Sequence, residues 1–416
     1  MAKADGHNEQ CTMDNVQWKK VRFDDFFSML PTNTLSRDKL NSQRGTYQNI
    51  HYGDVLIKYP FCLDCDKYDI PYINDDVKFN ATEVKDGDVI FADTAEDDTV
   101  GKCVEVLNVG DRKIVSGLHT YFCRPKYKLA LGYLGYFLNS NHFHDQLLPY
   151  IAGSKVSSVN RTSIACTYIS YPDSLPAQRR IAAILSAADK VIEQTRQLIG
   201  KYKSIKQGMM EDLLKPKEGW KKVRLGDYLK QKPDYGINAP AVPYDNHLPT
   251  YLRITDITED GYYSKKDIVS VASPEAWKYL MEEGDLVFAR TGASVGKTYL
   301  YNPNDGVLVF AGFLIRVRTN EDLLLPEFFK YQTQTPQYKN WIAANSMRTG
   351  QPGINGNEYE EFSFYMPYNN ESPDLPEQRR IAKILSGIDR KIEAEEKVLE
   401  KYEKMKKGLM ERLLGE

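Results

Sequence analysis

The sequence lacks the features of a membrane-spanning, secreted or strongly basic protein. No apolar run approaches the 18 or more residues of a membrane span, and the start, MAKADGHNEQ, has no signal-peptide pattern. All six cysteines lie before residue 167 and are scattered, which does not suggest a disulfide framework. The formal net charge is −2, low for a protein that binds nucleic acid through phosphates alone. We therefore expect a cytoplasmic protein with reduced thiols, in which any nucleic-acid contact comes from local clusters or a partner.

An internal repeat organises the chain. The 40 residues from Leu175 (LPAQRRIAAILSAADKVIEQTRQLIGKYKSIKQGMMEDLL) align without gaps with those from Leu375, and 21 positions are identical. WKKVRFDDF from Trp18 is echoed by WKKVRLGDYL from Trp220, and GDVIFADT from Gly87 by GDLVFART from Gly284. A chain of 416 residues is also too long for one core. The repeat predicts a disordered tail (1–14), globular domains (15–174 and 219–374), long helices (175–214 and 375–416) and a linker (215–218).

Each copy of the 40-residue segment is predicted to form one long helix. Ser174 and Asp374 are N-cap candidates, a proline follows in the first turn, and Pro216 ends the first helix. Apolar residues spaced by four and three form a coiled-coil stripe on each helix. The stripes consist of Ile181, Leu185, Ala188, Ile192, Ile199, Tyr202, Met209 and Leu213 in the first helix, and of Ile381, Leu385, Ile388, Ile392, Leu399, Tyr402, Leu409 and Leu413 in the second.

A helix with such a stripe needs a partner of similar length. About 37 residues at a rise of 1.5 Å each span about 55 Å, and the chain supplies one copy for the other. We therefore predict an antiparallel pair that separates the two globular domains, with two unrelated surface helices as the alternative. Gly208 and Gly408 each cost about 1 kcal/mol relative to alanine inside a helix, which predicts either close approach of another backbone or a kink.

The globular domains are predicted to mix helices and strands. Strand-like runs are GDVLIKYP from Gly53, GDVIFADT from Gly87, DLVFART from Asp285 and VLVFAGFLIRVRT from Val307. One amphipathic helical stretch follows in each domain, starting at Leu129 and at Pro326. The predicted fold class is α+β, with two similar recognition-type domains separated by two long antiparallel coiled-coil helices.

The repeated motifs together resemble those of specificity (S) subunits of type I restriction–modification systems. The motifs are the LPxQRRIAxIL opening, the GMMxxLL and GLMxxLL helix ends, WKKVRLGD, and GDLVFART followed by GASVGK, and they cover nearly the whole chain from Trp18 to Leu414. The resemblance implies that each globular domain is a target recognition domain for one half of a split, asymmetric site in double-stranded DNA. It also implies that the helices dock two methyltransferase (M) subunits, which restriction (R) translocase–nuclease subunits can join. S-adenosylmethionine, ATP and Mg²⁺ would then be bound by the partners.

No catalytic centre is identified in the sequence. Adenine methylation would need a Gly-rich cofactor loop and an Asn/Asp-Pro-Pro-aromatic motif, and neither is present. The segment Gly292–Thr298 is one residue short of a nucleotide-binding P-loop. The acids and lysine at residues 75–78 could belong to a metal-dependent nuclease, and Cys62 with Cys65 to half of a zinc site, but the second copy has no equivalent of either. We predict a non-catalytic DNA-binding subunit; the alternatives are a coiled-coil scaffold that binds two proteins and a self-contained nuclease.

Candidate DNA contacts lie in loops of both domains, because Arg pairs bidentately with guanine and Gln with adenine. In the second domain they are Arg290, Thr291, Ser294 and Lys297, with Arg348, Thr349 and Gln351 in a later loop. In the first domain they are Lys102, Lys155, Ser157, Ser158, Asn160 and Arg161. Where the second domain has Arg290, the first has Asp93, and an acidic cluster follows. An acid can accept from cytosine N4, but a cluster repels phosphate, so this loop either turns away from DNA or leaves reading mainly to the other residues.

Overall fold

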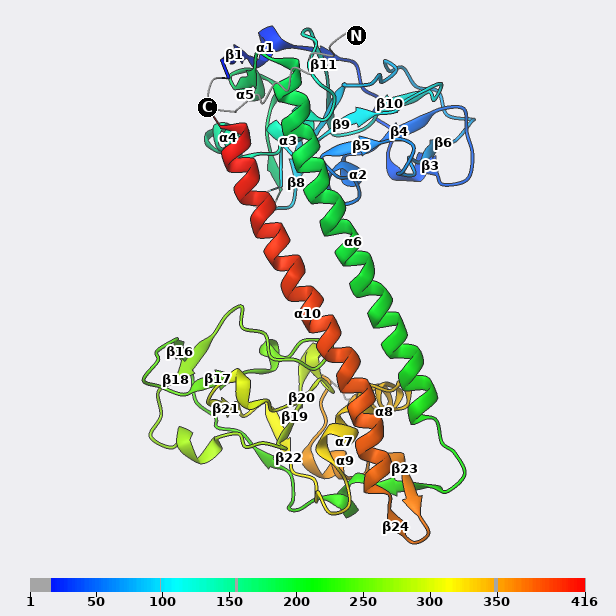
Figure 1. The fold of residues 1–416 in the computed structure, drawn as a ribbon, viewed down its shortest axis with the longest axis vertical. Helices are drawn as coiled ribbons and strands as arrows, with labels where there is room; N and C mark the ends of the chain where they lie inside the picture. The colour runs from blue at the N-terminus through cyan, green and yellow to red at the C-terminus, as the bar shows by residue number, and fades with distance from the viewer. Residues whose placement is uncertain (1–15, 98, 154–155, 348–350, 416) are drawn as a thin grey trace, which may run out of the picture. The chain divides into compact units, whose positions relative to one another are not determined.

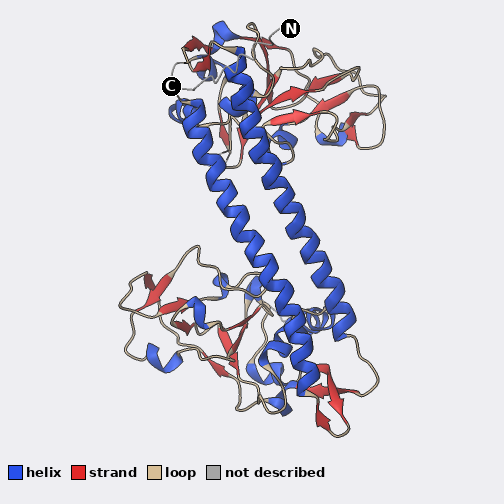
Figure 2. Cartoon of the chain, in the orientation of Figure 1, coloured by secondary structure: helices blue, strands red, loops and turns tan. Residues whose placement is uncertain are grey.

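The computed structural model describes residues 16–97, 99–153, 156–347 and 351–415. The tail predicted over residues 1–14 lies outside this range. Contacts divide the chain into two compact units: unit 1 is Met1–Arg196 with Lys397–Glu416, and unit 2 is Gln197–Glu396. Each unit thus contains one globular domain and half of each long helix. The strands in both domains are short and are joined by extended loops (Figure 2).

Two helices of 40 residues, α6 (Leu175–Leu214) and α10 (Leu375–Leu414), form where the repeat predicts them. The Glu377 backbone N–H donates to the Asp374 carboxylate at 3.0 Å, which confirms Asp374 as an N-cap. Space is open around the position that a Cβ would occupy at Gly208 and at Gly408. The predicted close approach of another backbone at these glycines is therefore wrong for the part of the chain that the structure describes. Among the described helices, none is both long and apolar enough to cross a bilayer.

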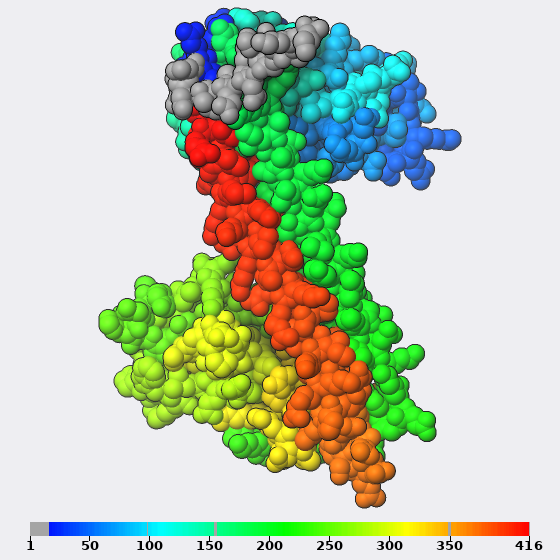
Figure 3. Space-filling view, viewed as in Figure 1, coloured from blue at the N-terminus to red at the C-terminus, as the bar shows by residue number. Residues whose placement is uncertain are grey.

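Within each unit the two helices run antiparallel (Figure 1, Figure 3). In unit 1, Asp189 of α6 lies 2.5 Å from Lys406 of α10, and Arg196 lies 2.6 Å from Glu403. Residue numbers therefore fall along α10 as they rise along α6. Unit 2 shows the same order, with ion pairs of 2.9 Å for Lys203 with Glu396 and 2.8 Å for Lys206 with Asp389.

The predicted apolar stripes are buried or half-buried along both helices. In unit 1, Ile181 and Leu185 share one core with Leu413 and with residues of the globular domain. In unit 2, Ile381 and Leu385 share a core with the globular domain and with the end of α6. Each globular domain is thus built onto the ends of both helices, which explains why the helix sequences are repeated together with the domains.

A buried glutamine connects the start of each long helix to its globular domain. In unit 1, the Ala130 N–H donates to the Gln178 carbonyl oxygen at 2.8 Å, and the Gln178 amide donates to the Pro172 carbonyl at 2.7 Å. In unit 2, Gln378 accepts from the Leu325 N–H at 2.9 Å and donates to the Leu323 carbonyl at 3.0 Å. Because an unpaired backbone group in the core is costly, these contacts account for the glutamine in both copies of LPxQRR.

The globular domain of unit 1 holds several small sheets. Its five-stranded sheet has the order β2 (Phe27–Leu30), β11 (Thr120–Pro125), β7 (Val89–Ala92), β9 (Cys103–Leu107), β5 (Cys62–Asp64). A four-stranded sheet has the order β10 (Ile114–Ser116), β4 (Gln48–Ile50), β6 (Tyr72–Ile73), β3 (Leu40–Asn41). Two antiparallel pairs join β1 (Trp18–Arg22) to β13 (Tyr168–Pro172) and β8 (Thr94–Ala95) to β12 (Ser157–Ser158). The α-helices are α1 (Phe23–Phe26), α2 (Tyr52–Ile57), α3 (Tyr133–Phe137), α4 (Asn141–Leu147) and α5 (Arg161–Ala165).

The globular domain of unit 2 has a related organisation. One four-stranded sheet has the order β15 (Asp234–Tyr235), β22 (Leu314–Val317), β19 (Leu286–Ala289), β20 (Thr298–Leu300). The other has the order β16 (Ala241–Pro243), β18 (Val269–Val271), β17 (Thr250–Leu252), β21 (Leu308–Phe310). A third sheet joins β14 (Trp220–Arg224), β23 (Ser363–Asn369) and β24 (Ser372–Pro373). The α-helices are α7 (Pro326–Gln332), α8 (Pro336–Ser346) and α9 (Gly356–Glu360).

Two element predictions need correction. The run from Gly53 to Pro60 is not a strand, because most of it belongs to α2. The His51 side chain accepts from the Gly53 N–H at 3.2 Å and caps that helix, a local contact that apolar alternation does not show. The stretches from Leu129 and from Pro326 each form two successive α-helices rather than one, and Thr335 and Pro336 start the second helix in unit 2.

Candidate nucleic-acid interface

Two candidate loops of unit 2 lie against each other although about 60 residues separate them. The Gly292 N–H donates to the Pro352 carbonyl at 3.0 Å, and the Ile354 N–H donates to the Arg290 carbonyl at 2.9 Å. Thr291 and Gly353 form an isolated antiparallel bridge. Gly292 has a φ of +72°, and a Cβ on it would lie 3.1 Å from the Gln351 amide nitrogen, so both backbone and space favour glycine. The structure thus combines Arg290, Thr291 and Gln351 in one surface.

Arginine and aromatic side chains stand together at this surface. The Arg290 guanidinium lies over the ring of Tyr235, 4.9 Å from its centroid. The Arg290 N–H donates to the Phe313 carbonyl at 3.1 Å, and the Phe313 side chain is 57% exposed. Stacking on a ring fixes the plane of a guanidinium while leaving its edge available as a hydrogen-bond donor. The arrangement fits Arg290 to bidentate recognition of a base.

Of the remaining predicted contacts of unit 2, the structure describes Lys297 and Ser294. The Lys297 ammonium lies 2.7 Å from a carboxylate oxygen of the exposed Glu259, and the lysine side chain is 21% exposed. Ser294 lies in the same turn, where its carbonyl accepts from the Lys297 N–H at 3.0 Å. Arg348 and Thr349 fall outside the described residues. Tyr235 and Phe313 were not predicted, since neither belongs to a motif that the two copies share.

Unit 1 contains the same loop arrangement. The Val159 N–H donates to the Asp93 carbonyl at 3.0 Å, as Ile354 does to Arg290, and β8 pairs with β12 so that Thr94 faces Ser158. Ser157 and Ser158 therefore lie in a short strand beside the Asp93 loop. By this register Asp93 occupies the position of Arg290.

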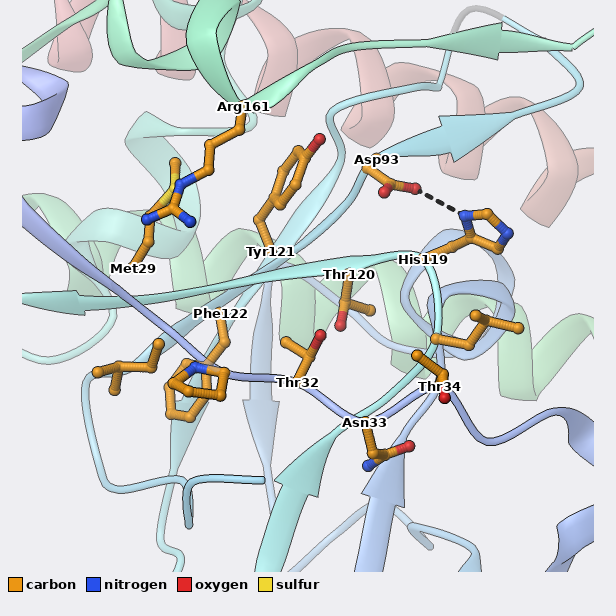
Figure 4. Close-up of a pocket in the computed structure, with 13 residues that line it drawn as sticks. Met29, Thr32, Asn33, Thr34, Asp93, His119, Thr120, Tyr121, Phe122 and Arg161 are labelled. Carbon is orange, nitrogen blue, oxygen red and sulfur yellow. Dashed lines mark ion pairs between the residues drawn. The ribbon is translucent and has the colours of Figure 1, made fainter. Parts of the chain in front are cut away.

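Arg161 is an exposed cation of this region in unit 1. It lines an open pocket of about 350 Å³ together with Asp93, His119 and Tyr121. The other nine lining residues are Met29, Leu30, Pro31, Thr32, Asn33, Thr34, Leu118, Thr120 and Phe122. Figure 4 shows Arg161 and Asp93 on either side of Tyr121.

 The His119 Nδ1 lies 3.3 Å from the Asp93 carboxylate. In the described part of the chain, Arg161 makes no ion pair, so its charge faces the pocket and solvent.

Two predicted contacts of unit 1 have structural roles. The Lys102 ammonium donates to the Leu56 carbonyl at 2.7 Å at the end of α2, and burial lowers the pKa of this amine. The Asn160 side chain accepts from the Ser163 N–H at 2.8 Å and caps α5. Lys102 is therefore held within the fold, and we remove it from the proposed DNA contacts. Lys155 falls outside the described residues.

The chemical alternatives gain no support from the geometry. Burial raises the pKa of both Cys62 and Cys65. Among the described residues, no group of three or more His, Cys, Asp or Glu side chains is placed to hold a metal ion. Lys297 is followed at once by β20 rather than by the helix that a P-loop precedes.

One polar contact between the long helices occurs in both units and was not predicted, because its residues lie outside the predicted apolar stripes. Asp189 with Lys406, and Asp389 with Lys206, are ion pairs between the long helices, and each aspartate also accepts a hydrogen bond from a tyrosine of the globular domain. These residues are identical in the two copies of the repeat. That identity at polar positions was the available signal.

Comparison with known proteins gives a consistent result. The chain matches the family described as type I restriction modification DNA specificity domain twice, over residues 15–201 and 217–404. It is 26% identical over 367 residues to the protein named as the MjaX type I restriction enzyme specificity subunit of Methanocaldococcus jannaschii, covering 79% of this chain and 77% of that protein. It is also 26% identical over 202 residues to the MjaVIII specificity subunit of the same organism, covering 48% and 43%.

Two solved structures have a similar fold. The crystal structure of the type I restriction–modification S subunit from M. genitalium aligns with a TM-score of 0.59 at 15% identity, covering 97% of both chains. A chain from a study of complex assembly and conformational transition of the type I system aligns with a TM-score of 0.52 at 17% identity, covering 95% of this chain and 97% of that one. At these identities the similarity concerns the fold.

Proposed function

Because this chain belongs to the type I restriction modification DNA specificity family, we propose that its two domains read two different half-sites of one asymmetric DNA target. The observation that supports this is the paired loop present in both units, at Arg290 with Gln351 and at Asp93 with Ser158. The backbone hydrogen bonds of the two loop pairs correspond, whereas the side chains differ in charge. Two loop pairs with the same backbone arrangement but different side chains suit two domains that bind different bases.

Joining two readers in one chain raises the effective concentration of the second once the first has bound. Affinity then depends on both half-sites being present. This addresses the low net charge of −2, because a modest number of phosphate contacts per domain is sufficient. Partner subunits that also contact DNA would add to the affinity.

We propose that catalysis resides in partner subunits. The repeated surfaces of α6 and α10 would dock two methyltransferase subunits, one for each copy of the repeat, and restriction subunits would join that assembly. S-adenosylmethionine would be bound by the methyltransferase, and ATP and Mg²⁺ by the restriction subunits. In this arrangement the chain decides where adenine is methylated and holds none of these cofactors itself.

The test is to produce the chain with its cognate methyltransferase in cells and to map methylated adenines. We expect one bipartite sequence in which both halves are specified. Exchanging residues 219–374 for the matching segment of a relative should change one half of the methylated sequence and leave the other unchanged. An unchanged sequence would instead indicate a scaffold that does not read DNA, and methylation independent of sequence would also contradict the proposal.

A further inference from the structure

Asp93 and Arg290 make equivalent backbone hydrogen bonds in their two units. The Arg290 N–H donates to the Phe313 carbonyl at 3.1 Å, and its carbonyl accepts from Ile354 at 2.9 Å. The Asp93 N–H donates to the His119 carbonyl at 3.2 Å, and its carbonyl accepts from Val159 at 3.0 Å. Both residues directly follow a strand of the central sheet, β19 or β7. The two side chains therefore leave equivalent places in the two domains.

The chemistry at this place is opposite in the two units. A guanidinium carries only donors, and it matches the O6 and N7 acceptors of guanine in the major groove. A carboxylate carries only acceptors, and it matches the exocyclic amino group of cytosine, or that of adenine. Exchanging arginine for aspartate at this equivalent position therefore changes which base group the side chain can bind, from a hydrogen-bond acceptor to a hydrogen-bond donor.

The surroundings of Asp93 leave it able to accept another hydrogen bond. One carboxylate oxygen accepts from the Thr94 hydroxyl at 2.8 Å and lies 3.3 Å from the His119 Nδ1. Among the residues that the structure describes, no hydrogen bond reaches the second oxygen. The Asp93 side chain is 21% exposed and lines the pocket of Figure 4, so the second oxygen is not enclosed by protein.

In unit 1 a positive charge of this region is on Arg161 rather than at the position of Asp93. Arg161 begins α5 directly after the cap Asn160, and the corresponding place in unit 2, directly after the cap Asn355, is Gly356. Asp93 and Arg161 both act on Tyr121: burial is the largest cause of its raised pKa, Asp93 raises it further and Arg161 lowers it. A cation near Asp93 offsets the repulsion between the carboxylate and a DNA phosphate.

We propose that Asp93 and Arg290 are equivalent base-reading residues of opposite polarity: Arg290 donates to a guanine in one half-site, and Asp93 accepts from an exocyclic amino group in the other. Arg161 supplies the phosphate contact beside Asp93. This inference rests on the proposed function, since it assumes that both domains contact DNA.

The test uses the complex of the full chain with its cognate methyltransferase and duplexes that contain the mapped methylation sequence. In one half-site each guanine is replaced in turn by 7-deazaguanine, which lacks the N7 acceptor. In the other, each cytosine is replaced by 2-pyrimidinone and each adenine other than the methylated one by purine, which lack the amino group. We expect a loss of about tenfold in methylation rate at one position of each half-site, as for the loss of one good base contact.

The variants assign these positions to residues. With Arg290→Ala the loss at the critical guanine should disappear, since the contact is already absent, while the amino-group position keeps its effect. With Asp93→Asn the loss at the critical amino-group position of the other half-site should disappear, or the base preferred there should change, while the critical guanine keeps its effect. Arg224→Ala and Asp66→Ala, which alter exposed ion pairs elsewhere, are matched controls expected to keep both effects.

If both variants keep the wild-type sensitivity at every substituted base, or if Asp93→Asn raises the rate equally for all duplexes, the inference is wrong. The second result would mean that Asp93 acts only by repelling phosphate. Sequence-independent methylation by the wild-type complex would instead contradict the proposed function, so the two failures are distinguishable.

Discussion

Asp389 lies 2.8 Å from the Lys206 ammonium and accepts a hydrogen bond from the Tyr331 phenol at 2.7 Å. In unit 1, Asp189 has the corresponding contacts with Lys406 and with Tyr136. Each cluster joins α6 and α10 to a short helix of the globular domain, α7 or α3. Because hydrogen-bonding partners on three elements must meet at one carboxylate, the cluster favours a single alignment of the two helices within its unit.

Asp389→Ala should be strongly destabilising. It would leave the Lys206 and Lys330 ammonium groups buried without their counter-charge, and removal of one partner from a buried ion pair costs about 3–5 kcal/mol. Chemical denaturation followed by circular dichroism would measure this. The control Glu403→Ala breaks a half-exposed pair with Arg196 and should cost less than about 1 kcal/mol. Equal effects of the two substitutions would contradict the role of Asp389.

Glu105 should make stability depend on pH. Its buried carboxylate accepts from the Gly132 and Gly135 N–H groups at 2.8 Å each; burial raises its pKa to about 7, and these hydrogen bonds oppose that rise. With an unfolded pKa near 4.5, the folded state holds the proton more tightly, so its stabilising contribution is complete below the unfolded pKa and is lost as pH rises through the folded pKa. Between pH 6 and pH 8 the free energy of unfolding should fall by about 1 kcal/mol more in the wild type than in Glu105→Gln.

Parallel pH profiles of the wild type and Glu105→Gln would contradict this prediction. The comparison of slopes is needed because the substitution also removes one acceptor for a backbone N–H. That loss shifts the stability of the variant at every pH, whereas only titration of the carboxyl changes the slope.

Tyr235 should support DNA binding through its ring rather than its hydroxyl. Tyr235→Ala removes the surface on which Arg290 lies, and a partly exposed cation–π contact contributes about 0.5–1 kcal/mol, so affinity for the cognate duplex should fall about two- to fivefold. Tyr235→Phe keeps the ring and loses only the acceptor for the Gly356 N–H. Fluorescence anisotropy should therefore show near-normal affinity for Tyr235→Phe; equal losses in the two variants would contradict this account.

Arg161 and Lys102 should respond differently to truncation. Arg161→Ala should weaken binding to all duplexes and reduce the slope of log affinity against log salt by about 0.9, as for one lost phosphate contact. Lys102→Ala should leave that slope unchanged but lower the stability of unit 1, because its ammonium donates to the Leu56 carbonyl at the end of α2. Binding measured at several salt concentrations, with a parallel denaturation experiment, separates the two roles.

Much of the fold could be predicted because its signals are local or repeated. The bounds of α6 and α10 follow from caps, prolines and a 40-residue segment that occurs twice. The α2 segment was predicted wrongly because a cap at His51 outweighs the strand-like alternation that follows. The ends of the long helices and the start of α2 are decided by contacts between residues that are close in the sequence.

The candidate site could be predicted only in part. Arg290 and Gln351 were selected for their side-chain chemistry, but their proximity depends on backbone hydrogen bonds between segments about 60 residues apart. Lys102 was selected on the same grounds, yet the Leu56 carbonyl, 46 residues away in sequence, binds its ammonium. Which basic residues remain available to DNA is a property of tertiary structure.

Gly208→Ala and Gly408→Ala should each stabilise the chain. Among the described residues, no atom outside the helix's own backbone would lie within 4 Å of a Cβ at either glycine. Replacing glycine by alanine in a helix interior gains about 0.5–1 kcal/mol, because the unfolded chain loses conformational freedom. Gly135→Ala is the matched control, since its Cβ would lie 2.4 Å from the Phe61 carbonyl oxygen, and it should be destabilising. Denaturation midpoints of the three variants give the comparison. A loss of stability in Gly208→Ala or Gly408→Ala would contradict this prediction.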